Sequence, residues 1–188
     1  MSGLTPAPES APAHPTRIVL TGFMGAGKTT VGALLAERLG WRFVDSDRVV
    51  EERAGMTIGA IFDRQGETGF RELEAAAIRD VIRQQHLVLA LGGGALEKLD
   101  TRALLASLGE TLIVFLEAPL ETMMARCAAH EHGPVRPVLA DRERLASRWS
   151  ERLPWYRQAH LIVDTRDLGP DAVAERILQS AGKRGVLA

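Results

Sequence analysis

The chain has 188 residues, enough for one domain whose core needs no disulfide or metal to stabilise it. Its 23 basic and 24 acidic residues give a net charge of −1, which argues against a nucleic-acid-binding protein. No apolar run approaches the roughly 20 residues of a membrane span, and the single cysteine, Cys127, allows no disulfide within the chain, so we expect a cytoplasmic protein with neither nucleic acid nor membrane as a partner.

The first segment, residues 1–15, contains four prolines among small residues and no apolar run that could pack. Such a composition is typical of a disordered tail. From residue 16 to residue 184, short apolar runs alternate with helical patterns, which is typical of a parallel α/β sheet with helices on both faces. The sequence therefore predicts an N-terminal tail, 1–15, followed by one domain, 16–184.

Strands and helices are expected to alternate along this domain. The predicted strands are 17–21, 42–44, 86–91, 111–116 and 160–163. The predicted helices are a first one ending near 39, then 48–54, 58–64, 67–85, 97–108, 119–128, 141–156 and 170–181. Five apolar strands separated by helices imply a five-stranded parallel sheet, and ligands of such sheets bind beyond the C-terminal ends of the strands.

The loop after the first predicted strand carries the strongest motif. Residues 22–29, GFMGAGKT, match the G-x-x-x-x-G-K-[ST] phosphate-loop pattern at every fixed position. Lys28 would supply a positive charge to the β- and γ-phosphates, and the Thr29 hydroxyl would be a ligand of Mg²⁺. We predict that nucleotide phosphates bind against the backbone and side chains of Gly25, Ala26, Gly27, Lys28, Thr29 and Thr30.

A phosphate loop alone is shared by GTPases, motor ATPases and small-molecule kinases. The sequence has no N-K-x-D guanine motif, and its third predicted strand ends in Gly92, Gly93 and Gly94 rather than in a carboxylate. The chain is also short for a motor. These features favour a monomeric kinase.

Asp45 and Asp47 flank Ser46 at the end of the second predicted strand. Alternate residues of a strand point the same way, so both carboxylates could face one cavity, where a cation or a substrate hydroxyl would relieve their repulsion. Asp47 could equally cap the helix predicted to begin at residue 48. The spacing alone leaves both interpretations open.

Six segments, in this order and spacing, resemble the shikimate kinase family. They are GFMGAGKTT (22–30), FVDSD (43–47), GETGFRELE (66–74), LGGGA (91–95), VRPVL (135–139) and LPWYRQAH (153–160). The resemblance extends over roughly residues 17–182. It implies a P-loop kinase fold with a mobile lid, and transfer of the γ-phosphate of ATP to the 3-hydroxyl of shikimate with Mg²⁺, a step toward chorismate and the aromatic amino acids.

The resemblance also implies roles on the acceptor side. Arg71 and Arg157 match arginines that bind the substrate carboxylate, and the planar fork of arginine suits that bidentate contact. If Phe70 packs inward, Arg71 should project toward the edge of the cleft. The glycines 92–94 would form part of the substrate wall. Asp47 would hold the acceptor hydroxyls and take the proton, while Asp45 would hold Mg²⁺ through water.

On the nucleotide side, Arg136 matches the arginine of the family's lid, expected here at about 128–140, and would stabilise the transferring phosphoryl group. We expect Arg126 and Arg166 to lie near the nucleotide. Two alternatives remain: a related kinase for another polyol acid, such as gluconate, and a nucleotide-binding regulator without catalysis. The pair of arginines argues against the first, and the acceptor-side aspartate argues against the second.

Overall fold

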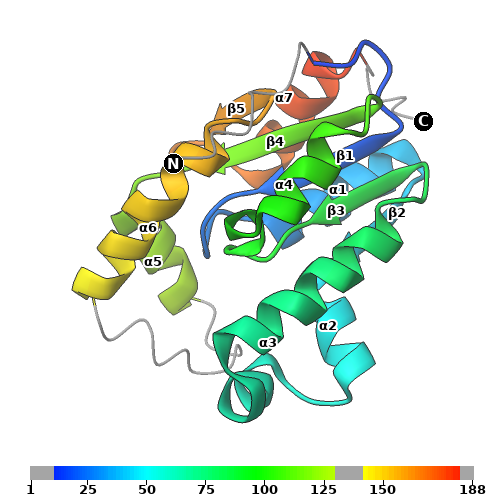
Figure 1. The fold of residues 1–188 in the computed structure, drawn as a ribbon. Helices are drawn as coiled ribbons and strands as arrows, with labels where there is room; N and C mark the ends of the chain where they lie inside the picture. Colours follow the sequence, from blue (N-terminus) through cyan, green and yellow to red (C-terminus); the bar gives the residue numbers. More distant parts are fainter. Residues whose placement is uncertain (1–10, 130–141, 183–188) are drawn as a thin grey trace.

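The computed structural model describes residues 11–129 and 142–182 (Figure 1). In these two ranges, no helix has the length and apolar character needed to cross a membrane. Arg136, most of the predicted lid, and residues 1–10 of the predicted tail lie outside the described residues. Residues 11–14 are exposed or partly exposed, whereas Pro15, the last residue of the predicted tail, is buried.

A five-stranded parallel sheet forms the centre of the fold, in the order β2-β3-β1-β4-β5. Leu20 in the middle strand pairs with Ala90 on one side and with Val114 on the other. Helices cover both faces of this strand, which explains why it is apolar on both sides. The strands are β1 (Arg17–Thr21), β2 (Arg42–Asp45), β3 (Leu87–Ala90), β4 (Thr111–Glu117) and β5 (Leu161–Asp164). All five predicted strands and the predicted fold class are confirmed.

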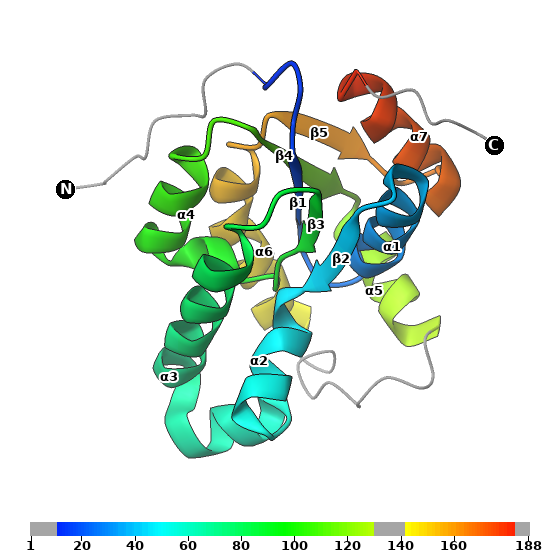
Figure 2. The same ribbon diagram turned by 90° about the vertical axis from the view of Figure 1, so that its right-hand side faces the viewer.

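Helices cover both faces of the sheet. Figure 2 shows α1 and α7 on one face and α4 and α6 on the other. The helices are α1 (Lys28–Leu39), α2 (Ser46–Ala54), α3 (Ile58–Val81), the short 3₁₀-helix η1 (Ala95–Glu97), α4 (Leu99–Ala106), α5 (Leu120–Ala129), α6 (Arg142–Tyr156) and α7 (Pro170–Ser180). In both views α2 and α3 lie side by side and extend away from the sheet.

Of two predicted helical regions, one is confirmed and one differs. The helices predicted at 58–64 and 67–85 are the two parts of α3, which is interrupted at Gly66, whose φ of 69° and ψ of −177° are not helical. Glycine adopts this conformation at little steric cost, so the chain turns there between the two helical parts. The single helix predicted at 97–108 is instead η1 and α4, separated by the extended backbone of Lys98.

The apolar side chains form two separate clusters. The larger one surrounds the sheet and includes β1, β3 and β4 almost entirely. The smaller one lies between α2 and α3 and consists of Val50, Ile61, Phe70 and Ala77. The part of α3 that follows Ala77 belongs to the main core through Ile78 and Val81.

The site is positioned by the ends of three neighbouring strands. Because β1, β2 and β3 are parallel, their C-terminal ends meet at one edge of the sheet. The phosphate loop follows β1, Asp45 ends β2, and the glycines 92–94 follow β3 by one residue. Three segments far apart in the sequence are thereby brought together.

Candidate active site

The phosphate loop curls around its own lysine. Lys28 Nζ donates hydrogen bonds to the carbonyl oxygens of Gly22 and Phe23, at 2.8 and 2.9 Å. Gly25 and Gly27 have φ values of 73° and 92°, in the left-handed region that favours glycine. A Cβ at Gly25 would also collide with the backbone of α5. The glycines therefore let the loop curl closely around Lys28, and α1 begins directly at the end of the loop.

The first turn of α1 contacts the end of β2. Thr29 Oγ1 donates a hydrogen bond of 2.9 Å to Asp45 Oδ2. A hydroxyl and a carboxylate beside a phosphate loop are oxygen ligands of the kind Mg²⁺ prefers. The Thr29 side chain is exposed, so it can turn toward a cation. These two residues therefore fit the predicted metal role.

Asp45, not Asp47, caps the helix that follows. The helix α2 begins at Ser46, and Asp45 Oδ1 accepts a hydrogen bond of 3.0 Å from the Asp47 N–H. The alternative in which Asp47 is the cap is therefore wrong. Asp47 lies in the first turn of α2, where the helix dipole favours a carboxylate. It is also not on the strand, so the alternation of strand residues does not apply to it.

The carboxylate of Asp47 lies against the glycine loop. A Cβ at Gly92 would collide with both Asp47 Oδ1 and Glu74 Oε1, so a larger residue there would displace these two carboxyl groups. The N–H of Gly92 donates a hydrogen bond of 2.8 Å to Ser46 Oγ, which is fully buried. The N–H of Gly92 is therefore already bound within the protein, and it joins the glycine loop to the start of α2.

Arg71 is buried, in contrast to its expected place at the edge of the cleft. Its side chain is 9% exposed. It binds Glu74 Oε2 through Nη1 at 2.8 Å and Glu67 Oε1 through Nη2 at 3.2 Å. A Cβ at Gly94 would collide with this guanidinium group, so the glycine loop and Arg71 touch directly. The structure thus brings Arg71, Asp47 and the glycine loop together.

Glu74 is a site residue that the sequence reasoning missed. Its side chain is 1% exposed. Burial raises the pKa of Glu74 to about 7, the neighbouring Arg71 opposes this rise, and Asp47 adds to it. Glu74 therefore binds the arginine on one side and meets the negative charge of Asp47 on the other, and its pKa lies close to neutral pH.

Arg152 on α6 is the second residue that was missed, and it lies beside the glycine loop. Its side chain is 8% exposed, and Nε is 2.6 Å from Glu97 Oε1. Its guanidinium carbon lies 5.7 Å from the centre of the Phe23 ring in the phosphate loop. A Cβ at Gly93 would be 3.7 Å from Arg152 Nη1 and 3.8 Å from the Gly22 carbonyl oxygen. Gly93 therefore lies between Arg152 and the phosphate loop.

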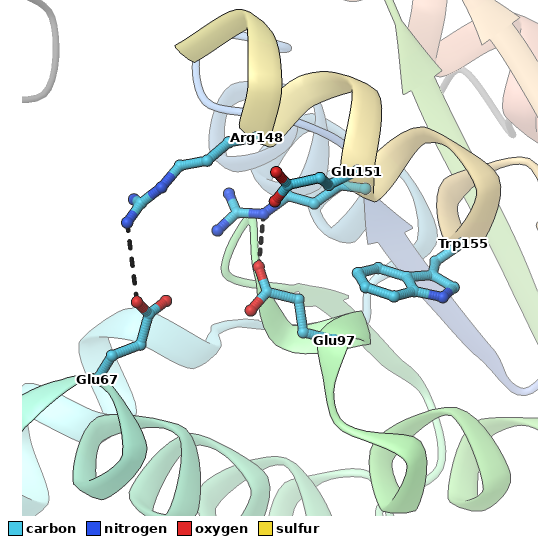
Figure 3. A pocket seen from close by; sticks show the side chains of 6 residues that line it. Glu67, Glu97, Arg148, Glu151 and Trp155 are labelled. Atoms are coloured by element: carbon cyan, nitrogen blue, oxygen red, sulfur yellow. Dashed lines mark hydrogen bonds and ion pairs between the residues drawn. The ribbon is translucent and has the colours of Figure 1, made fainter. Parts of the chain in front are cut away.

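Tyr156 and an open cavity complete this side of the site. The Tyr156 hydroxyl donates a hydrogen bond to the Gly93 carbonyl oxygen. Burial raises the pKa of this hydroxyl, which keeps its proton available for donation. A cavity of about 300 Å³ lies beside Arg152. Figure 3 shows how its lining side chains converge from α3, η1 and α6; they are Glu67, Glu97, Arg148, Glu151, Arg152 and Trp155.

Arg157 is not brought to this cluster. Its side chain is 60% exposed, and its Nη2 lies 3.5 Å from Glu117 Oε1 at the end of β4. The reason is helical geometry: Arg157 is one residue beyond Tyr156, so it points away from the buried face of α6. A signal for Arg152 was present in the sequence. Leu145, Trp149, Arg152 and Tyr156 follow the i, i+4, i+7, i+11 spacing of one helix face, which places this arginine in line with core residues.

The two arginines expected near the nucleotide both lie at the turn that follows β5. Arg126 on α5 donates two hydrogen bonds to Thr165. Its Nη1 binds the Thr165 hydroxyl at 3.0 Å, and its Nη2 binds the Thr165 carbonyl oxygen at 2.6 Å. Arg166 follows Thr165, and its side chain is 57% exposed, with Nη2 3.8 Å from Asp164 Oδ2. The structure thus brings Arg126 to the turn after β5, beside Arg166.

The chain is similar in sequence and in fold to known proteins. The family model described as shikimate kinase matches residues 24–181. The shikimate kinase of Psychrobacter arcticus is 43% identical over 163 residues, 86% of this chain and 87% of the relative.

Two solved structures are also similar. The shikimate kinase of Bacteroides thetaiotaomicron has a TM-score of 0.81 and 30% identity, and the match covers 89% of this chain and 98% of the other. The shikimate kinase of Acinetobacter baumannii in complex with shikimate has a TM-score of 0.80 and 37% identity, covering 88% and 92%. On the similarity in sequence and in fold, the chain belongs to the shikimate kinase family.

Proposed function

We propose that the chain transfers the γ-phosphoryl group of ATP to the 3-hydroxyl of shikimate, giving shikimate 3-phosphate and ADP. One observation carries the assignment of the site. Two buried arginines, Arg71 from α3 and Arg152 from α6, lie on either side of the carboxylate of Glu97, beside a glycine loop that borders the phosphate loop. This arrangement can hold an acid next to a nucleotide.

The carboxylate of shikimate would bind between Arg71 and Arg152. Both side chains are less than a tenth exposed, so their contacts with an anion would be strong. We assign the second position to Arg152 rather than to Arg157, because only Arg152 borders the glycine loop and the cavity. Arg157 lies instead at Glu117, toward the turn after β5.

The hydroxyl groups of the substrate would face Asp47. In the reaction, the bond between the γ-phosphorus and the β,γ-bridging oxygen breaks, and a bond forms to the 3-oxygen of shikimate. The proton of that hydroxyl passes to the Asp47 carboxylate. Phosphoryl transfer depends mainly on positioning and charge stabilisation, so a weak base in the right place suffices.

The remaining residues act on the nucleotide. The loop 22–29 would wrap the phosphates with its N–H groups, and Lys28 would exchange its bonds to Gly22 and Phe23 for phosphate oxygens. Thr29, and Asp45 through water, would hold Mg²⁺, which supplies charge neutralisation at the β- and γ-phosphates when it is bound. Arg126 and Arg166 would lie on the adenine side.

We also propose that the enzyme acts as a monomer in the cytoplasm. The single cysteine is consistent with a reducing compartment. Sedimentation equilibrium of the purified protein measures the oligomeric state directly.

A coupled assay of ADP release tests the function. The full chain is incubated with ATP and Mg²⁺, and ADP is followed with shikimate, with gluconate and with no acceptor. We expect release that depends on shikimate and saturates with its concentration. Release that depends on gluconate alone would assign the chain to a different kinase. No release with either acid, from a protein that binds ATP, would favour a nucleotide-binding regulator.

A further inference from the structure

Glu97 is placed so that one carboxylate contacts both arginines of the proposed clamp. Its Oε1 lies 2.6 Å from Arg152 Nε, and its Oε2 lies 3.6 Å from Arg71 Nε. The residue ends η1, directly after the glycine loop, and its side chain is 31% exposed. Figure 3 shows Glu97 reaching into the cavity beneath α6.

The carboxylate of Glu97 lies where the carboxylate of an incoming acid would have to bind, between Arg71 and Arg152. Arg71 is already bound by Glu74 at Nη1 and by Glu67 at Nη2. Its Nε is buried and, within the described part of the chain, makes no hydrogen bond. The side of the guanidinium group that remains for an acid therefore faces Glu97. An acid that bound there while Glu97 stayed in place would bring two negative charges together.

We propose that Glu97 is an internal substitute for the substrate carboxylate, and that the acid must displace it from Arg71 and Arg152 in order to bind. This inference rests on the proposed function, because it takes the arginine pair as the carboxylate site. Glu97 is then a specificity-determining residue of the reaction: it competes with every anion that enters the clamp.

The exchange of Glu97 for the acid keeps Arg152 paired with a carboxylate at every stage, while Arg71 also retains Glu74 and Glu67. A buried arginine without a counter-ion is strongly destabilising, so an Arg152 left without a carboxylate would be costly. Exchanging one carboxylate for another preserves the charge balance, and the released Glu97 side chain reaches solvent through the cavity. The apparent affinity for the acid is reduced by the fraction of molecules in which Glu97 has left the clamp. A small anion without hydroxyl contacts to Asp47 gains too little to displace it.

Glu97→Gln tests this proposal, with Glu151→Gln as the matched control. Both substitutions remove one negative charge from the same cavity, but Glu151 makes its hydrogen bond with Ser147 and not with the arginines. Shikimate binding is measured by calorimetry without nucleotide, and KM and kcat are measured with the coupled assay. We expect Glu97→Gln to lower Kd and KM for shikimate by on the order of threefold to tenfold, a larger change than in the KM for ATP.

Several results would overturn the proposal. A rise in the shikimate Kd of Glu97→Gln would show that Glu97 positions Arg152 for the substrate instead. An equal fall in Glu151→Gln would show a general charge effect of the cavity. If Glu97→Gln does not fold, Glu97→Asp serves, since its shorter side chain withdraws the carboxylate and should give a smaller fall in Kd; an unchanged or higher Kd contradicts the proposal.

The clamp itself is tested separately. In Arg152→Lys the charge remains but the planar fork is lost. An unchanged shikimate Kd in this variant would contradict the assigned carboxylate site, and with it the basis of the inference. A raised Kd in Arg152→Lys together with a raised Kd in Glu97→Gln would retain the clamp and refute only the competition.

Discussion

Thr29 Oγ1 donates a hydrogen bond to Asp45 Oδ2 at 2.9 Å, and this contact joins the first turn of α1 to the end of β2. The other oxygen of Asp45 accepts the N–H of Asp47. The carboxylate of Asp45 thus faces the phosphate side, whereas that of Asp47 faces Gly92 and Glu74. The two aspartates can therefore be separated by experiment.

Asp45→Asn should reduce kcat, and a higher Mg²⁺ concentration should restore part of it. Asparagine keeps the helix cap, because its side-chain oxygen accepts the same N–H, so the fold should be preserved. What is lost is the negative charge that holds the metal through water. Initial rates over a range of Mg²⁺ concentrations measure the effect, and circular dichroism checks the fold.

Asp47→Asn should lower kcat by about 10²–10⁴-fold, and Mg²⁺ should not restore it. The substitution removes the carboxylate that faces the acceptor hydroxyl, which the metal cannot replace. The same Mg²⁺ titration is the measurement. Rescue of Asp47→Asn by Mg²⁺ would exchange the roles assigned to the two aspartates.

Arg152→Ala should raise the shikimate KM by at least about 30-fold, because a charged contact in a nearly dry site is worth about 2 kcal/mol or more. Arg157→Ala, on the turn after the same helix, should change it by less than about fivefold, because its ion pair is largely exposed. The ATP KM should be nearly unchanged in Arg152→Ala. A large rise in the shikimate KM in Arg157→Ala alone would show that Arg157, and not Arg152, binds the substrate carboxylate.

Lys28→Ala should lower kcat by at least about 10²-fold. The site loses a positive charge that would stabilise the negative charge on the phosphoryl group during transfer. The protein should remain folded, since Lys28 donates hydrogen bonds to the carbonyl oxygens of Gly22 and Phe23 in its own loop and lies outside the buried core. Thermal unfolding and the coupled assay measure the two properties independently. Near-normal turnover in a folded variant would contradict the mechanism.

Glu74 should make stability depend on pH. Its pKa rises from 4.5 in the unfolded chain to about 7 in the folded protein, so between these pH values the folded state retains a proton that the unfolded chain has lost. The free energy of unfolding should therefore fall as pH rises through this window, by up to about 3 kcal/mol.

Glu74→Gln stays neutral and should lose this part of the pH dependence. Glu67→Gln is the matched control, because Glu67 binds the same arginine but is 46% exposed and should leave the slope unchanged. Urea unfolding at about pH 5 and about pH 7.5 measures both. Identical slopes in the wild type and in Glu74→Gln would place the Glu74 pKa near its ordinary value.

The sequence predicted the strands, and the loop and helix that follow β1, well, because these elements depend on local patterns. An apolar run followed by GFMGAGKT defines a strand, a loop and a helix within a few residues. The acceptor side depends on which helix face meets which loop, and a motif compared along the chain does not show this. Arg152 and Arg157 differ by five residues, and only the packing of α6 distinguishes them.

The carboxyl groups at the site were missed for a related reason. Glu74 and Glu97 are ordinary surface residues by type, and most glutamates are exposed. They are drawn inward because the buried Arg71 and Arg152 require counter-ions, so identifying the arginines is a precondition for finding them.

The small apolar cluster between α2 and α3 has a consequence for the motions of the protein. Because Val50, Ile61 and Phe70 pack apart from the main core, α2 and the first part of α3 form a unit that can open without disrupting the sheet. Arg71 belongs to this unit, whereas Arg152 belongs to α6. An acid bound between them would fasten the unit to α6, so the backbone amides of α2 and of the first part of α3 should exchange with solvent more slowly when the acid is bound.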